Sequence, residues 1–229
     1  MKTFPLDYRI EDLLKKHHHS SHFSDFFRKF GLSLIYVGRE VLRPDCSYVS
    51  KYLTLWLIEN YKIYEGKRIL EIGCGCGIQS LTMGLMGASK ILATDISEYA
   101  VNSCTQNKNI YNLSSIIEVR RGDLFRPIDS HEKFDFVVFN HPFFDGKPKR
   151  NMFEYAILDD RELAGIFLEN VWRYLNPGGI VLMPYSCICG QKNNPIRFAQ
   201  QLNIFHKIQF EKSDQDGSHL IIAFANNIN

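Results

Sequence analysis

Apolar and polar residues follow two alternating patterns from about residue 67 to the end of the chain. Short apolar runs that predict buried strands lie at residues 68–73, 90–95, 116–123, 134–140 and 179–185. Apolar residues spaced three and four apart predict helices over about 78–86, from Ser97 to 104 and over 162–175. Strands that alternate with helices are typical of a mainly parallel sheet covered on both faces.

The C-terminal part of the chain breaks this alternation. Residues 205–212 and 219–225 are two strand-like segments joined by a short polar stretch that contains Asp and Gly. This spacing favours an antiparallel hairpin over a helical crossover. The sequence therefore predicts an α/β fold, with a Rossmann-like, seven-stranded, mainly parallel sheet that ends in an antiparallel hairpin.

The first 62 residues have a different character. Apolar residues at helical spacing are Leu6, Ile10, Leu13, Leu14, Phe23, Phe26, Phe27 and Phe30. Residues 32–37 form a short apolar run that predicts a strand, and residues 47–61 predict a further helix. We therefore expect residues 1–62 to form a mostly helical cap at the substrate entrance and residues 63–229 to form the main domain.

Composition places the chain among globular proteins. Of its 229 residues, 45% are hydrophobic and 23% are charged, and the net charge of +2 does not by itself predict a nucleic-acid partner. No apolar run approaches the roughly 20 residues that cross a bilayer. The N-terminal residues include acids where a signal peptide has an apolar segment. We expect an intracellular, cytoplasmic protein without membrane contact.

Cysteine and histidine residues raise the question of a metal site. The pairs Cys74/Cys76 and Cys187/Cys189 offer four thiolates, and His18 and His22 would share one face of a helix. The C-x-C spacing differs from the usual C-x2-C of zinc sites, and no acid or cysteine completes a shell around the histidines. Buried reduced thiols and solvated histidines are the favoured interpretation, so we expect no metal.

A glycine-rich segment, EIGCGCG, joins the first predicted strand of the main domain to a helix. Gly73, Gly75 and Gly77 allow a ligand to approach the backbone closely. Their G-x-G-x-G spacing differs from the G-x-G-x-x-G of dinucleotide-binding loops, and this predicts a loop over a nucleoside and an amino-acid tail. A tight turn without a ligand is the simpler alternative.

Acidic residues follow the next two predicted strands. Asp95 ends one strand, where a carboxylate accepts hydrogen bonds from ribose hydroxyls. Asp123 and Leu124 follow the other strand and would bracket an adenine, the acid bonding its amino group and the apolar side chain covering the ring. The alternatives are a favourable acid at a helix N-terminus for Asp95 and a solvated loop residue for Asp123.

The segment Asn140-His141-Pro142-Phe143 ends the fourth predicted strand. The Asn140 side-chain oxygen and the His141 carbonyl offer two acceptors for the N–H groups of a nitrogen that attacks an activated methyl group. Pro142 biases His141 towards an extended backbone, and Phe143 offers an aromatic face to a planar group. The segment predicts a site for a planar amine or amide nitrogen.

Together these motifs, with TDIS (94–97), GDLF (122–125) and LNPGG (175–179), resemble those of class I S-adenosylmethionine-dependent methyltransferases. Within that class, the chain resembles the methyltransferase small domain group, which includes release-factor glutamine and ribosomal-RNA guanine-N2 methyltransferases. The resemblance implies S-adenosylmethionine as cofactor and direct methyl transfer without a metal. It also implies cofactor contacts by Glu71, Ile96 and Asn140, and a pocket border formed by Pro44 and Ser47.

One position departs from the pattern of this group. The second residue of its N-P-P-Y or N-P-P-F motif is a proline, whereas this chain has His141. The backbone carbonyl is retained, but the turn loses one fixed φ angle. A titratable imidazole that accepts a proton is an alternative role for His141, although an imidazolium would repel a sulfonium. A degenerate scaffold without turnover is the second interpretation of this change.

The acceptor is less sharply indicated. NHPFFDG (140–146) resembles an extension found in the guanine-N2 enzymes, and Lys147, Lys149 and Arg150 follow it as candidates for phosphate contacts. We therefore expect N-methylation of RNA or of a protein glutamine, with a small-molecule amine as the alternative. A nicotinamide-dependent oxidoreductase is disfavoured by the glycine spacing and by the motif at Asn140.

Overall fold

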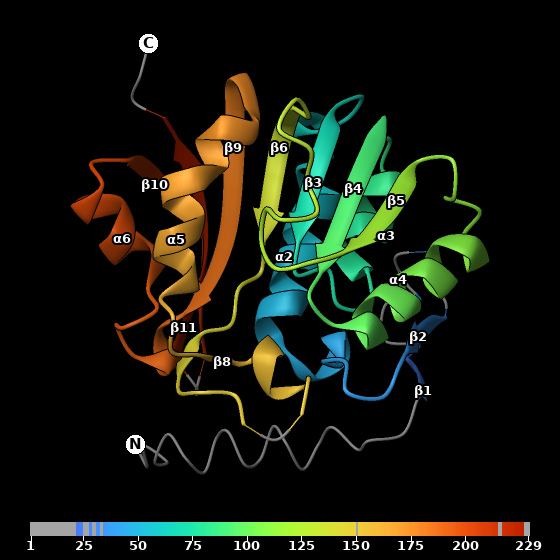
Figure 1. The fold of residues 1–229 in the computed structure, drawn as a ribbon, viewed down its shortest axis with the longest axis horizontal. Coiled ribbons are helices and arrows are strands. Elements are labelled where there is room, and N and C mark those ends of the chain that lie inside the picture. Colours follow the sequence, from blue (N-terminus) through green and yellow to red (C-terminus); the bar gives the residue numbers. More distant parts are fainter. Residues whose placement is uncertain are drawn as a thin grey trace.

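The computed structural model describes residues 22–24, 28, 31, 32, 34–149, 151–214 and 217–226. In this part of the chain a seven-stranded sheet has the order β10-β11-β9-β6-β3-β4-β5 (Figure 1). Its strands are β3 (Arg68–Ile72), β4 (Lys90–Asp95), β5 (Ile117–Arg121), β6 (Phe134–Phe139), β9 (Leu175–Ser186), β10 (Phe205–Asp214) and β11 (Gly217–Ala225). The strands from β9 to β5 are parallel, and β11 runs antiparallel to both β9 and β10. The predicted sheet and its C-terminal hairpin are confirmed.

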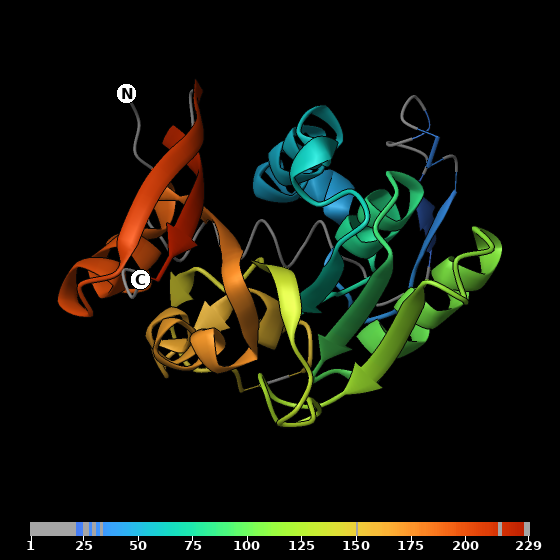
Figure 2. The same cartoon turned by 90° about the horizontal axis from the view of Figure 1, so that it is seen from above.

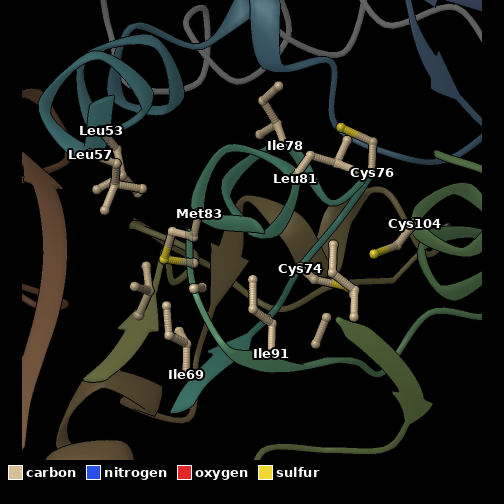
Figure 3. Packing of buried hydrophobic residues seen from close by; sticks show 14 of the residues in the cluster. Leu53, Leu57, Ile69, Cys74, Cys76, Ile78, Leu81, Met83, Ile91 and Cys104 are labelled. Atoms are coloured by element: carbon tan, nitrogen blue, oxygen red, sulfur yellow. The ribbon is translucent and has the colours of Figure 1, made fainter. Parts of the chain in front are cut away.

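Helices cover both faces of the sheet (Figure 2). One face carries α2 (Tyr48–Glu59), α3 (Ile78–Leu85) and α4 (Glu98–Ile110), and the other carries α5 (Leu163–Asn170) and α6 (Pro195–Gln201). The core on the first face includes Leu53 and Leu57 of α2 together with Ile69 and Ile91 of the sheet (Figure 3). Helix α2 is therefore built into the same core as the sheet, while a domain boundary at residue 62 stays a prediction.

The central strand β6 shows why the apolar runs become buried parallel strands. Phe136 and Val138 point into the core on the α3 side, whereas Val137 and Phe139 point into the core on the α5 side. Alternate residues of a strand face opposite sides, so a strand buried on both faces needs an unbroken apolar run. This arrangement places the end of β6, and Asn140 after it, in the middle of one sheet edge.

The predicted helix over residues 162–175 is only partly correct. Helix α5 ends at Asn170, a 3-10 turn covers Val171–Tyr174, and β9 already begins at Leu175. Leu175 already pairs with Phe134 of β6, before a shift in register, and the Asn176 amide donates to the Asp135 carboxylate at 2.7 Å beside this pair. Ile166, which the spacing predicts to point inward, is 39% exposed.

Helix α6 lies between β9 and β10, where the sequence pattern predicted no helix or strand. Asn194 caps this helix by accepting a hydrogen bond from Ile196 N at 3.0 Å, and Pro195 takes its first position. Asn and Pro commonly occupy these positions at the start of a helix. The helix has only seven residues, however, which is too short for its apolar residues to show a clear helical spacing. Two further short strands, β7 (Phe144–Asp145) and β8 (Leu158–Asp159), pair with each other beside the sheet edge.

The N-terminal region differs from the helical prediction at Phe23. This residue lies in β1 (His22–Ser24), which pairs antiparallel with β2 (Ile35–Val37). The other residues from Leu6 to Phe30 on which that prediction rested, and His17 to His19, lie outside the described residues. Asn107 of α4 bonds both backbone groups of Tyr36 at 2.8 Å, so β2 is held against the main domain. Every helix in the described part is too short or too polar to span a bilayer.

A test of the packing at the first turn of α3 is substitution of Gly77. This glycine has φ +85°, and a Cβ there would lie 2.6 Å from Cys104 Sγ. An alanine at this positive φ would strain the backbone, and its methyl group would clash with Cys104. Because the two costs add, we expect Gly77→Ala to lower the free energy of unfolding by about 2–4 kcal/mol. Gly66→Ala is the matched control, since Gly66 has φ +70° and no atom within 4 Å of the position of a Cβ. Urea unfolding that gives equal losses for the two variants would contradict this packing role.

Candidate functional site

A cavity opens at the carboxyl ends of β3, β4, β5 and β6. The empty space between its walls, counted together with the open mouth, is about 980 Å³. Its lining includes the glycine loop, Asp95, Asp123 and Asn140, together with two further groups of residues: Glu40, Val41, Leu42 and Pro44, and Met152, Tyr155 and Ala156. Ligands of open α/β sheets bind at this edge, because successive parallel strands all end there. The cavity is therefore the candidate active site.

The floor of the cavity is formed by the glycine loop and Asp95. Gly73 and Gly75 have φ values of +68° and +55°, and Gly75 N donates to Asp95 Oδ2 at 2.9 Å. The other oxygen of Asp95 accepts a hydrogen bond from Ser97 N at 2.9 Å. Burial raises the pKa of Asp95 above its usual value. Each carboxylate oxygen still has a second lone pair, so the side chain remains able to accept two hydroxyl groups.

Asp123 is held by an arginine that the motif analysis did not identify. Arg161 donates from both terminal nitrogens to the Asp123 carboxylate, at 2.9 and 3.2 Å, and this lowers the pKa of Asp123. Asp159 positions the turn that carries Arg161, because its oxygens accept from Arg161 N and Leu163 N, each at 2.8 Å. The bidentate pair keeps Asp123 ionised at the cavity wall.

Asn140 is oriented from α2. Its Nδ2 donates to Ser50 Oγ at 3.3 Å, and Ser50 itself is buried and lines the cavity. Since the amide nitrogen is engaged with Ser50, the Asn140 oxygen is left to accept hydrogen bonds. Ser47 lies one helical turn earlier and does not line the cavity. It caps α2 by accepting from Ser50 N at 3.3 Å.

The His141 side chain points away from the cavity and is 1% exposed. Its Nε2 donates to the carbonyl of Asn193 at 3.0 Å. Its ring is nearly parallel to the Tyr185 ring, and the two ring centroids lie 6.2 Å apart. Burial lowers the pKa of His141 to about 4. The imidazole is therefore neutral at physiological pH and anchors the loop after β6 through its side chain.

Asn193 ties the same loop to a second segment. Its side-chain amide donates to the carbonyls of Phe143 and Asp159, at 3.4 and 3.1 Å. The Phe143 ring packs edge-on against His141 and Tyr185 and does not line the cavity. Tyr155, 42% exposed at the cavity wall, is the aromatic side chain available at the mouth.

The structure brings most of the expected site residues to the cavity. Those that line it are Pro44, Gly73, Gly75, Asp95, Ile96, Asp123, Leu124, Asn140 and Pro142. Those that do not line it are Ser47, Glu71, Gly77, His141 and Phe143. Glu71 is 1% exposed and accepts a hydrogen bond from the Ser80 hydroxyl beneath the loop. The functional roles of all of these residues stay predictions.

Cysteines of the glycine loop belong to the hydrophobic core. Cys74 and Cys76 are 2% exposed and lie with Cys104 of α4 among aliphatic side chains (Figure 3). A hydrogen bond with Cys104 together with burial raises the pKa of the Cys74 thiol, and burial raises the pKa of the Cys76 thiol, in both cases well above the usual value. In the part of the chain that the structure describes, no three His, Cys, Asp or Glu side chains converge as metal ligands would.

Comparison with known proteins identifies the family. The model of the methyltransferase small domain matches residues 52–183, which is more than half of the chain. The chain belongs to the methyltransferase small domain family. A protein assigned as a protein N5-glutamine methyltransferase from Methanocaldococcus jannaschii is 29% identical over 170 residues, covering 69% of this chain and 84% of that protein. The ribosomal protein L11 methyltransferase of Exiguobacterium sibiricum is 29% identical, but the match spans only 41% of its length.

Solved structures share the fold. The 16S rRNA N2 G1207 methyltransferase of T. thermophilus, in complex with S-adenosylmethionine and guanosine, superposes with a TM-score of 0.64 at 17% identity, over 85% of this chain and 47% of that one. The ribosomal protein L11 methylase of Lactobacillus delbrueckii gives a TM-score of 0.56 at 19% identity, and the match covers 75% of this chain and 76% of that one. The predicted Rossmann-like methyltransferase fold is confirmed.

The buried acid beneath the loop provides a pH test. Burial raises the pKa of Glu71 from 4.5 to about 8, so the folded protein binds this proton more tightly than the unfolded chain. The resulting stabilisation is lost as the pH rises from about 4.5 through 8, at on the order of 1 kcal/mol per pH unit. We expect Glu71→Gln to remove this slope in urea unfolding measured from pH 5 to 9.

The matched control is Glu169→Gln, at an exposed position of α5. This variant should keep the wild-type pH dependence of the free energy of unfolding. A Glu71→Gln profile parallel to the wild type over the whole range would show that Glu71 is ionised in the folded protein, against its burial.

Proposed function

We propose that this protein is an S-adenosylmethionine-dependent N-methyltransferase whose acceptor is a planar amide or amine nitrogen. The observation that carries the proposal is the placement of Asn140 at the cavity, with its amide nitrogen bonded to Ser50 and its oxygen left as an acceptor. A nitrogen nucleophile needs such an acceptor, because its N–H groups must be held while its lone pair is aimed at the methyl group.

The residues present fit this cofactor. Asp95 offers both carboxylate oxygens to a ribose at the end of β4, and Asp123 with Leu124 offers an acid and an apolar side chain beyond β5. Gly75 has no atom within 4 Å of the position of a Cβ, which leaves its backbone open to close approach. When bound, the cofactor supplies a methyl group activated by a sulfonium.

The loop after β6 would orient the acceptor. Asn140 Oδ1 and the His141 carbonyl would accept the N–H groups, and Pro142 restricts the backbone of His141, which directs that carbonyl. The His141 ring is buried and neutral, so it places no positive charge beside the cofactor. A proton-accepting role for this imidazole, the alternative drawn from the sequence, is disfavoured because the ring faces Asn193 and Tyr185.

A protein glutamine is the acceptor that the observations favour. The relative assigned as a protein N5-glutamine methyltransferase matches over 84% of its own length. Phe143 is partly buried, packs edge-on against His141 and Tyr185 and does not line the cavity, so it is not placed to stack on a base there. Among the described residues, the cavity wall carries Glu40, Asp95 and Asp123 against one basic residue, Arg161, and this balance disfavours a phosphate backbone within the cavity.

Guanine N2 in RNA is the second candidate. It is supported by the structural neighbour that binds guanosine and by the exposed side chains of Lys147 and Lys149 beside the site. Arg150, the third basic residue of this group, lies outside the described residues. The substrates in the relatives' names, ribosomal protein L11 and 16S rRNA, belong to the ribosome, which supports a cytoplasmic location for this chain.

The proposal is tested with a methyl-labelled cofactor. The acceptors are a glutamine-containing release-factor peptide, ribosomal RNA and small primary amines, and mass spectrometry then identifies the atom that carries the label. We expect the label on an amide nitrogen of the peptide. Label on guanine N2 would establish the second candidate, and cofactor binding without transfer to any of these pools would favour a scaffold without turnover.

Substitution of Asn140 tests its role in the reaction. Because Asn140→Ala removes the acceptor for the substrate N–H group, we expect kcat to fall by on the order of 10²-fold while the cofactor Kd stays within about twofold. Steady-state kinetics and calorimetry measure the two quantities. Parallel loss of cofactor affinity and rate would mean that Asn140 mainly holds the cofactor.

A further inference from the structure

A turn outside the cavity reaches the loop that carries Asn140. Residues 191–194, the 191–194 turn, lie between β9 and α6, and none of them lines the cavity. Within this turn Asn193 is 0% exposed. Burying a polar side chain is unfavourable unless it forms hydrogen bonds, so the contacts of Asn193 show what the turn holds in place.

Asn193 is bonded to the loop after β6 on both sides of Pro142. Residues 140–143 are named the acceptor loop here, because they carry the two groups expected to accept the substrate N–H. Before the proline, the Asn193 carbonyl accepts from His141 Nε2 at 3.0 Å. After it, the Asn193 side-chain amide donates to the Phe143 carbonyl at 3.4 Å. One residue therefore holds the backbone on either side of the His141 carbonyl.

The same amide also attaches the acceptor loop to β8. It donates to the Asp159 carbonyl at 3.1 Å. The backbone continues this attachment, because Phe144 N donates to the Ile157 carbonyl at 2.9 Å and Gly146 N donates to the Asp159 carbonyl at 3.3 Å. Asn193 thus fills the space between two short segments and bonds both of them.

The network extends from β8 to the wall that carries Asp123. The Asp159 carboxylate accepts from Arg161 N and Leu163 N, each at 2.8 Å. Arg161 in turn donates two hydrogen bonds to the Asp123 carboxylate. The acceptor loop and the acid expected at the adenine are therefore joined through Asn193, which bonds the acceptor loop directly and Asp123 only through two intermediates.

We propose that Asn193 is a positioning residue for methyl transfer. It acts through the acceptor loop, by fixing the direction of the His141 carbonyl towards the substrate nitrogen. Where the family motif restricts φ with a proline, this chain uses the bonded imidazole of His141 and the amide of Asn193. The rate depends on this direction, because the lone pair of the nitrogen must lie in line with the methyl group. The assignment rests on the proposed function, since it assumes a nitrogen acceptor at this loop.

The first test removes the side-chain donor. Asn193→Ala keeps the carbonyl that accepts from His141 and loses the bonds to Phe143 and Asp159. We expect kcat for transfer to the glutamine-containing peptide to fall about tenfold, while the Kd of S-adenosylhomocysteine stays within about twofold. Asn193→Ser, which keeps a donor on a shorter side chain, should give an intermediate loss and replaces the alanine variant if that variant unfolds.

A measurement on the ligand-free protein accompanies the kinetics. The amides of Phe144 and Gly146 are bonded to the segment that Asn193 attaches to the acceptor loop. We expect their hydrogen exchange, followed by NMR, to become faster in both Asn193 variants, because the loop opens more often without this attachment. Exchange at the wild-type rate would contradict the attachment whatever the acceptor is.

The substitution His141→Pro distinguishes positioning from general support of the fold. It restricts φ covalently, so the direction of the carbonyl at this position depends less on Asn193. We expect Asn193→Ala to lower kcat less than about threefold in the His141→Pro background, against about tenfold in the wild-type background. A residue that only stabilises the fold would cause the same loss in both.

Asn194→Ala is the matched control, because Asn194 belongs to the same turn but its side chain bonds Gln191 and Ile196 instead of the acceptor loop. Loss of this cap of α6 should lower Tm by about 2–4 °C and leave kcat at the wild-type value. Unchanged kcat in a folded Asn193 variant, a parallel loss of S-adenosylhomocysteine affinity, or an equal loss in both backgrounds would overturn the positioning role. A wild-type protein that transfers no methyl group to peptide, RNA or amine would instead overturn the proposed function and, with it, this assignment.

Discussion

The hydrogen bond from Gly75 N to Asp95 Oδ2 connects the two elements on which the site depends. It joins the loop after β3 to the end of β4 at 2.9 Å, and Cys74 N reinforces it by donating to Thr94 O at 3.0 Å. The loop takes this path because Gly73 and Gly75 adopt positive φ values. The cavity floor and the carboxylate that faces it are therefore one rigid unit, supported by the sheet.

Much of the fold follows from local patterns. The five parallel strands, the C-terminal hairpin and the caps at Ser47 and Ser97 are signalled by apolar runs and by short polar residues at helix starts. The start of β9 at Leu175 was not predicted, because it depends on the pairing of Leu175 with Phe134 of β6, which is distant in the sequence. Short elements such as α6 leave too few residues for a period to be detected.

The site was predictable where a motif residue sits on a loop at the end of a strand, as for Asp95, Asp123 and Asn140. It was not predictable where a role depends on tertiary contacts. Ser50 rather than Ser47 reaches Asn140, since Ser47 is used as the cap of α2. No local signal marks Arg161, whose contact with Asp123 appears only when the walls of the cavity are assembled.

The change from proline to His141 is accommodated by packing. A proline would restrict φ directly, whereas here the ring bond to Asn193 and the contacts with Phe143 and Tyr185 hold the same segment from inside the protein. The burial that keeps the imidazole neutral also takes it out of the cavity. The acceptor loop thus depends on the segment around Asn193, far along the chain.

The central claim is that the cavity binds S-adenosylmethionine, and its most direct test is an equilibrium titration of the wild-type protein. Calorimetry with S-adenosylhomocysteine, with NAD as the comparison ligand, measures it without any assumption about the acceptor. The account predicts saturable binding of one S-adenosylhomocysteine per chain and none of NAD. Absence of S-adenosylhomocysteine binding, or preference for NAD, would contradict it.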